Sequence, residues 1–189
     1  MRYPDFKDVL ARLGMSKFEI EKLLSNFNEV SFSKDEHILD IGNVFDDVYI
    51  LMHGAFRLYY LTPEGNESNK LFLFEQDIAF PIAPIAQKKP SLFGIIACEN
   101  SCALRIPYKS FKAILTQQGL WQQFYLVYLE WLVDTKIARE HRLLTLNKTE
   151  IIEDLANEEP KAYSRIHDYH LASYLGMSPV TFSRLRNRS

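Results

Sequence analysis

The segment that decides the fold reads HDYHLASYLGMSPVTFSRLRNRS and spans residues 167–189. Two helical patterns in it are joined by the turn Gly176-Met177-Ser178. Glycine permits the left-handed backbone of a tight turn, and serine followed by proline is a preferred helix start. A small residue, Ala172, lies four positions before the glycine and lets two helices cross closely. The segment therefore predicts a helix-turn-helix, with an ordinary helical hairpin that has a charged end as the alternative.

The predicted second helix has one apolar and one polar face. Its polar face is rich in arginine, which suits a helix that enters the major groove of DNA while the protein holds its other face. The residues expected to face inward are Leu171, Tyr174, Leu175, Phe182 and Leu185. The residues expected to contact DNA are Ser178, Pro179, Val180, Thr181, Ser183, Arg184, Arg186, Asn187 and Arg188.

Charge is distributed unevenly along the chain. Residues 161–189 contain five Lys and Arg residues and one Asp, a net charge of +4. Because the whole chain carries −2, the rest of it carries −6. An acidic body with a basic end is common in proteins that touch nucleic acid, and it also occurs where the end is merely a solvated tail.

Composition narrows the class of protein. The chain has 189 residues, of which 47% are apolar, enough for one domain or for a medium and a small one. No apolar run approaches the roughly 18 residues of a membrane span, and residues 1–14 mix charged and apolar groups instead of forming a secretory signal. We therefore expect a cytoplasmic protein with no membrane partner. Its two cysteines, Cys98 and Cys102, are too few for a disulfide framework or an iron–sulfur cluster.

The middle of the chain, from about residue 28 to 107, has the pattern of an antiparallel β domain. Short β-branched or aromatic segments alternate with turns such as Ile41-Gly42-Asn43 and Pro63-Glu64-Gly65-Asn66. The predicted strands are 29–32, 37–40, 48–52, 56–61, 70–74, 93–98 and 103–106. This number of short strands predicts a sandwich or jelly roll. Short helices are predicted on either side of it, at 4–13, 16–25 and 108–116.

A long helix is predicted from Leu120 to Leu146, because this stretch has no glycine or proline and carries two adjacent apolar stripes. One stripe is expected to cover the β domain and the other to pack on the same helix of a second copy around a two-fold axis. The residues of this dimer helix are Leu120, Phe124, Val127 and Trp131 in one stripe, and Trp121, Tyr125, Tyr128 and Leu132 in the other. The alternative is a central core helix in a monomer.

These segments together resemble the Crp/Fnr-type transcription regulators, in the form common among Bacteroidetes. The resemblance rests on the helix-turn-helix sequence 171–184 and on the strand-and-turn residues Gly42, Tyr49-Ile50-Leu51, Gly54, Arg57-Leu58-Tyr59 and Gly65-Asn66-Glu67. It implies an α+β fold with a cyclic-nucleotide-binding-like β roll at 1–116, a dimerisation helix at 117–146 and a DNA-binding unit at 147–189. It also implies a homodimer that reads a palindromic operator on double-stranded DNA, with RNA polymerase as a further partner.

The resemblance assigns roles within the helix-turn-helix. Ser178 and Thr181 match positions that touch phosphates, and Pro179, Val180 and Arg184 match positions that read base edges. Well-known members carry Arg and Glu where this chain has proline and valine, so its target sequence is expected to differ. The arginine can still bind guanine O6 and N7, and the valine can pack on a thymine methyl. Because the sequence ends soon after this unit, the wing seen in many relatives is expected to be reduced or absent.

The expected ligand site lacks the residues that hold a cyclic phosphate. Relatives that bind cyclic nucleotides carry a Gly-Glu pair and an Arg followed by Ser or Thr, and the corresponding segment 74–91 has neither glycine nor arginine. We therefore expect no cofactor and no cyclic AMP or GMP, and an unknown small-molecule effector remains open. The pocket expected for such an effector is formed by Glu75, Phe80, Ile82 and Ile85.

Two other functions remain open from the sequence. A cupin-type metalloenzyme would need clustered histidines, and only His37 and His53 fall among the predicted strands, so neither a metal site nor a catalytic residue is expected. His167 and His170 are expected to be surface residues near the DNA end rather than metal ligands. The other function is that of a small-molecule sensor that acts through protein contacts without binding DNA.

Overall fold

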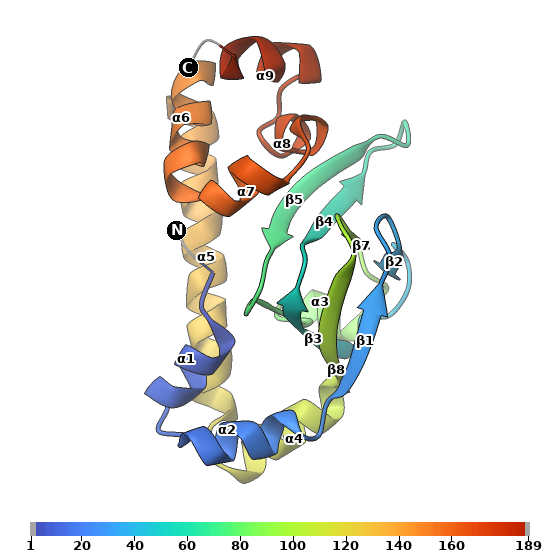
Figure 1. Cartoon of the computed structure of the whole chain (residues 1–189), viewed down its shortest axis with the longest axis vertical. Helices are drawn as coiled ribbons and strands as arrows, with labels where there is room; N and C mark the ends of the chain where they lie inside the picture. The colour runs from blue at the N-terminus through green and yellow to red at the C-terminus, as the bar shows by residue number, and fades with distance from the viewer. Residues whose placement is uncertain (1–2, 188–189) are drawn as a thin grey trace.

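The structure is a computed structural model that describes residues 3–187 (Figure 1). Its centre is a β roll of two antiparallel four-stranded sheets, with strand orders β1-β8-β3-β6 and β2-β7-β4-β5. The strands are β1 (Asn28–Phe32), β2 (His37–Leu39), β3 (Asp47–His53), β4 (Phe56–Leu61), β5 (Glu67–Leu73), β6 (Ile78–Ala79), β7 (Gly94–Ala97) and β8 (Ser101–Pro107). All seven predicted strands are present and β6 is an additional one. The predicted α+β class with an antiparallel β roll is confirmed.

The turn between β3 and β4 requires a glycine. Gly54 has a φ of +101°, in the left-handed region that favours glycine. A Cβ at this position would lie only 2.1 Å from the hydroxyl oxygen of Ser101. The carbonyl of Gly54 accepts a hydrogen bond from Arg165 of the C-terminal helices at 3.0 Å.

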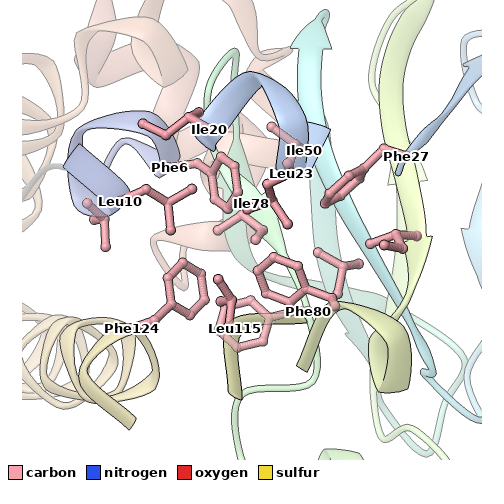
Figure 2. Close-up of a cluster of buried hydrophobic side chains, with 14 of the residues drawn as sticks. Phe6, Leu10, Ile20, Leu23, Phe27, Ile50, Ile78, Phe80, Leu115 and Phe124 are labelled. Carbon is pink, nitrogen blue, oxygen red and sulfur yellow. The ribbon is translucent and has the colours of Figure 1, made fainter. Parts of the chain in front are cut away.

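Two N-terminal helices, α1 (Phe6–Arg12) and α2 (Lys17–Leu24), close one side of the molecule. The predicted capping box starts α2, where the Ser16 N–H donates to Oε2 of Glu19 at 2.8 Å. Figure 2 shows side chains from these helices meeting others from the sheet and from the long helix α5 (Trp121–Thr145). The labelled members of this core are Phe6, Leu10, Ile20, Leu23, Phe27, Ile50, Ile78, Phe80, Leu115 and Phe124.

The long helix α5 is present as predicted, but its two apolar stripes are used within one protomer. Phe124 and Tyr128 are fully buried, and Trp131 is 7% exposed. Tyr125 donates its hydroxyl hydrogen to the carbonyl of Ile82 at 2.8 Å, and Tyr128 donates to the carbonyl of Pro4 at 3.3 Å. The remaining stripe residues, all partly buried, are Leu120, Trp121, Val127 and Leu132. The expectation that one of these stripes faces a second copy is therefore wrong. The N-terminal segment covers the face of the helix for which a second copy was expected.

A third set of apolar residues on α5 is exposed instead. Its members are Leu126, Val133, Ile137 and Leu144, with exposed fractions of 51%, 50%, 60% and 76%. Their spacing of seven, four and seven positions fits the a and d positions of a heptad repeat. This set, called the exposed stripe below, runs from the second turn of the helix to its last turn.

Four helices form the C-terminal unit: α6 (Lys148–Glu158), α7 (Pro160–Arg165), α8 (Asp168–Tyr174) and α9 (Pro179–Arg186). Helix α7 was not predicted, since it has only six residues and begins at Pro160. Arg142 of α5 is buried and pairs with Asp154 at 2.6 Å and with Glu159 at 3.4 Å. This ion-pair cluster fixes the C-terminal unit to the end of α5.

Two short helices complete the described part of the chain, α3 (Pro84–Lys88) between β6 and β7 and α4 (Tyr108–Gln117) before α5. None of the helices between residues 3 and 187 combines the length and the apolar character that crossing a membrane requires.

Candidate nucleic-acid interface

The turn between α8 and α9 has the predicted backbone. Gly176 has a φ of +67° and open space where a Cβ would lie, so the left-handed conformation is what favours glycine there. Ser178 caps α9, since its Oγ accepts a hydrogen bond from the Thr181 N–H at 3.2 Å, and the two hydroxyl oxygens lie 2.9 Å apart. Pro179 occupies the first turn of the helix. The start of α9 is therefore firmly positioned.

The inner face of α9 is held by the apolar core of the C-terminal unit. Phe182 is fully buried among residues of α6, α7 and α8, and Leu185 packs at the edge of this cluster. The residues that the sequence placed inside, Leu171, Tyr174 and Leu175, are buried as well. The prediction of the inward set is confirmed, and the helix-turn-helix is part of a packed unit rather than a free hairpin.

The outer face of α9 carries most of the residues expected to meet DNA. Val180 is 79% exposed, and Arg184 is exposed one turn further along. The other exposed members are Ser178, Pro179, Ser183 and Asn187, whereas Thr181 is half-buried. Arg188 lies outside the described residues. Residues one turn apart share a helix face, so valine and arginine can address the same groove. Their contact with DNA stays a prediction.

Arg186 is placed differently from the expectation. It forms an ion pair with Asp168 of α8 and donates through Nη2 to the carbonyl of Tyr163 at 2.9 Å. Its guanidinium also lies over the Tyr163 ring, 4.3 Å from the centroid. The side chain therefore fastens α9 to α7 and α8, and the assignment of Arg186 to the DNA-facing set is corrected: the unpredicted helix α7 supplies Tyr163, and α8 supplies Asp168.

The two histidines near the helix-turn-helix have different surroundings. His167 caps α8 by accepting from the Tyr169 N–H at 3.2 Å. His170 is half-buried, and burial together with the nearby Arg57 lowers its pKa to about 4. The expectation of two surface histidines therefore fails for His170, which lies against the β roll. Residues 3–187 contain no group of three or more His, Cys, Asp or Glu that could hold a metal ion.

Helix α8 packs directly on strand β5. The backbone N–H of Asn69 donates to Oγ of Ser173 at 3.1 Å, and Ser173 donates its hydroxyl hydrogen to the carbonyl of Glu67 at 2.9 Å. Asn69 is itself buried and its amide donates to the carbonyl of His170 at 3.3 Å. These hydrogen bonds join the helix-turn-helix to the β4–β5 hairpin.

A cluster of charges makes a second connection. Glu75, after β5, accepts from Nη1 and Nη2 of Arg165 at 2.8 Å each, and from Lys161 at 3.3 Å. Arg165 also pairs with Glu99 and donates to the carbonyl of Gly54 at 3.0 Å. Hydrogen bonds from Arg165 lower the pKa of Glu75 to about 2. Glu75 was expected to share a ligand pocket with Phe80 and Ile82. It lies in this cluster, where α7 brings two cations to it, and is not part of the cavity that those two residues line.

The hydrogen bonds between α8 and β5 and the charge cluster around Glu75 together form what we call the joint between the β roll and the C-terminal unit. It consists of Gly54, Glu67, Asn69, Glu75 and Glu99 on one side and Lys161, Arg165, His170 and Ser173 on the other. Sequence reasoning missed it entirely. Its partners lie up to 111 positions apart, and each is an ordinary polar residue in its local context.

Two of the other expected pocket residues do share a cavity. Phe80 and Ile82 line a space of about 90 Å³ between the β roll and α5. Ile85 lies on α3 and is 52% exposed, so it does not belong to the cavity wall. Small-molecule sites usually measure about 300–1,000 Å³, so this cavity accepts only a small ligand without rearrangement.

Comparison with known sequences identifies one part of the chain. Residues 29–118 match the family model described as cyclic nucleotide-binding domain. The potassium channel KOR1 of Oryza sativa subsp. japonica is 29% identical over 102 residues, which cover 54% of this chain and 12% of the channel. The chain thus spans about one-eighth of the length of that relative.

Solved structures resemble nearly the whole chain. FixK2 from Bradyrhizobium japonicum gives a TM-score of 0.76 at 17% identity, covering 86% of this chain and 83% of FixK2. A CooA variant from Carboxydothermus hydrogenoformans gives 0.74 at 18%, with 99% and 85% covered. The c-di-GMP-responsive global regulator CLP of Xanthomonas campestris gives 0.73 at 15%, with 92% and 91% covered. The chain therefore has the fold of these proteins: a cyclic-nucleotide-binding-type β roll, a long helix and a C-terminal helical unit.

Proposed function

We propose that the protein is a DNA-binding transcription regulator of the Crp/Fnr type that acts in the cytoplasm. The observation that carries this proposal is the two-faced helix α9, whose inner face is locked by Phe182 while Val180 and Arg184 point away from the protein. A rigid helix with an exposed arginine on a basic unit suits insertion into the major groove. The regulators with the same fold, such as CLP, support the proposal.

Within this function, the residues of α9 take separate roles. Arg184 reads a guanine through O6 and N7, and Val180 packs on a thymine methyl. Ser178 and Thr181, at the start of the helix, contact a phosphate. Arg186 contributes to the fixed position of α9 and not to base reading, since its guanidinium is held against Asp168 and Tyr163.

Dimerisation is proposed to use the exposed stripe of α5. Leu126, Val133, Ile137 and Leu144 lie at heptad spacing, and the same stripe of a second copy covers them in a short parallel coiled coil. A two-fold axis along this seam presents two copies of α9 to successive major grooves about 34 Å apart. The operator is therefore palindromic, and RNA polymerase is the further partner of the bound dimer.

A cyclic nucleotide is not the proposed effector. The cavity of about 90 Å³ is small for a nucleotide, and the segment 74–91 carries no arginine for a cyclic phosphate. The runner-up function is that of a sensor that signals through protein contacts alone. Selection of bound fragments from random DNA decides between them, since the regulator is expected to enrich paired half-sites and the protein-contact sensor none.

Replacing Arg184 by Ala tests the reading role. We expect a loss of about 1–3 kcal/mol in operator binding, with relaxed preference at one base position. Arg12→Ala, an exposed arginine on α1, serves as the control and leaves affinity unchanged. Fluorescence anisotropy over a range of salt concentrations measures both. An equal loss on unrelated sequences would contradict base reading, and salt-independent binding would contradict the proposed function itself.

Replacing Ile137 by Glu tests the dimer seam. A carboxylate at a d or a position of the coiled coil is expected to convert the dimer to a monomer at micromolar concentration, because the buried charge lacks a partner. Leu92→Glu, at a residue that is 63% exposed on the β roll, is the matched control and should stay dimeric. Light scattering coupled to size-exclusion chromatography gives the mass, and a wild-type monomer would reject the seam.

A further inference from the structure

Tyr174 lies where three parts of the molecule meet. It belongs to α8, the first helix of the helix-turn-helix, and is 4% exposed. Its ring packs edge to face on that of Phe72 in β5, with centroids 5.2 Å apart and an angle of 64° between the planes. The guanidinium of Arg139 in α5 lies over the same ring, 4.8 Å from its centroid. One side chain of α8 therefore contacts both the β roll and the long helix.

The hydroxyl of Tyr174 adds a directional contact. It donates to Oε1 of Glu159 at 3.0 Å, and the same oxygen accepts from Nη1 of Arg142 at 3.4 Å. Burial raises the pKa of Tyr174, so the hydroxyl keeps the proton that it donates. The phenol is thus tied to the buried ion-pair cluster that fixes the C-terminal unit to the end of α5.

The C-terminal unit shares its apolar core with the β roll. The buried cluster that contains Tyr174 and Phe182 also contains Ala55, Phe72 and Phe74, all of which come from the β roll. Phe182 is the fully buried residue of α9. Because protein interiors are close-packed, a shift of α8 against β5 is passed on to α9 through this cluster.

A tyrosine does more at this position than the local pattern requires. The inward face of α8 needs an apolar side chain to pack against α9, and a phenylalanine would supply one. A buried hydroxyl is costly unless it is hydrogen-bonded, and a hydrogen bond weakens steeply when its angle changes, whereas ring packing tolerates small rotations. The bond from Tyr174 to Glu159 therefore favours one orientation of α8 over neighbouring ones.

We propose that Tyr174 is a positioning residue that fixes the orientation of α9 relative to α5 and thereby sets the spacing between the two half-sites of the operator. The inference deepens the proposed function and rests on it for the consequence on DNA. In a two-fold dimer, the same rotation of both C-terminal units changes the separation of the two α9 helices. Base identity and half-site spacing are then controlled by different residues, Arg184 and Tyr174.

The variant Tyr174→Phe removes the hydroxyl and keeps the ring. Its effect on orientation is measured without DNA, by the distance between spin labels at Ala11→Cys on α1 and Ser183→Cys on α9, both at exposed positions. Cys98 and Cys102 are replaced by serine, and the labelled chain is diluted with unlabelled chain so that only distances within one copy are measured. We expect a narrow distance distribution in this background and a distribution about twofold broader after Tyr174→Phe.

Tyr169→Phe is the matched control, because it makes the same change in the same helix at a residue that is 48% exposed. It is expected to retain the narrow distribution. An equally narrow and unshifted distribution in Tyr174→Phe would overturn the proposal. A lower melting temperature with an unchanged distribution would do so as well, since it would show that the hydroxyl stabilises the unit without orienting it.

Selection of bound fragments from random DNA supplies the second measurement. The wild type is expected to enrich one half-site spacing, and Tyr174→Phe several spacings with the same preferred bases in each half-site. Arg184→Ala is expected to do the reverse, with altered base preference and unchanged spacing. The wild-type spacing in Tyr174→Phe would overturn the proposal and leave the proposed function standing. Enrichment of no site by the wild type would contradict the proposed function, while the distance measurement still decides whether Tyr174 orients α9.

Discussion

The core of the β roll and the joint are held by different interactions. In the core, fully buried side chains such as Phe6 and Phe124 pack ring against ring, with centroids 6.0 Å apart (Figure 2). In the joint, Arg165, Glu75 and Asn69 make ion pairs and hydrogen bonds at the surface between two units. Apolar burial depends little on pH or salt, whereas exposed ion pairs depend on both. The joint is thus the contact that solution conditions or a ligand can alter while each core stays folded.

The largest expected effect comes from a variant that removes a side chain from the core. Phe124→Ala is expected to lower the free energy of unfolding by about 3–5 kcal/mol, because it removes a fully buried ring and leaves a cavity. Phe18→Ala, at a residue that is 73% exposed on α2, is the control and should change stability by less than about 0.5 kcal/mol. Urea unfolding measures both, and similar losses in the two variants would mean that the core packing described here is wrong.

A smaller effect is expected from the joint. Glu75→Gln should cost about 1–2 kcal/mol at pH 7, since the charge-assisted hydrogen bonds from Arg165 are weakened in a partly exposed setting. The pKa of Glu75 is about 2 in the folded chain and ordinarily about 4.5. Its contribution is therefore complete above pH 4.5 and is lost as pH falls toward 2, so the gap between wild type and variant should close over that window.

Thermal melting as a function of pH measures the difference in stability between the wild type and Glu75→Gln. Limited proteolysis shows which part of the chain loses stability. Cleavage is expected to rise in α7 and α8 and not in the β roll. Glu153→Gln, an exposed carboxylate on α6, is the control with no expected change. Proteolysis spread evenly over the chain would show that the joint does not open independently of the cores.

The smallest effect concerns His170. Its pKa is about 4 in the folded chain and ordinarily about 6.5, with burial as the main cause of the difference. Between pH 6.5 and 4 the unfolded chain binds the proton more readily, so stability falls as the pH is lowered. His170→Gln should remove this slope, a difference of about 1 kcal/mol after allowance for solvent screening. Melting curves between pH 7 and 4 test it, with exposed His53→Gln retaining the wild-type slope.

Local sequence patterns predicted the elements well. Seven strands, the capping box at Ser16, the turn at Gly176 and the buried face with Phe182 follow from residues close together in the chain. The errors concern partners that are distant in sequence. Arg186 carries the same charge as Arg184, and only the placement of α7 decides that one is fastened inside and the other remains exposed.

The long helix shows the same division. Its sequence determined that more than one face would be covered, because apolar residues occupy two adjacent stripes. Which surface covers each stripe was decided by tertiary structure, since the N-terminal helices return to it and leave Val133 and Ile137 exposed instead. The sequence by itself thus determined the β roll, the long helix and the helix-turn-helix, because their signals are local. The joint, and the fact that Val133 and Ile137 stay exposed, depend on how segments distant in sequence pack after folding.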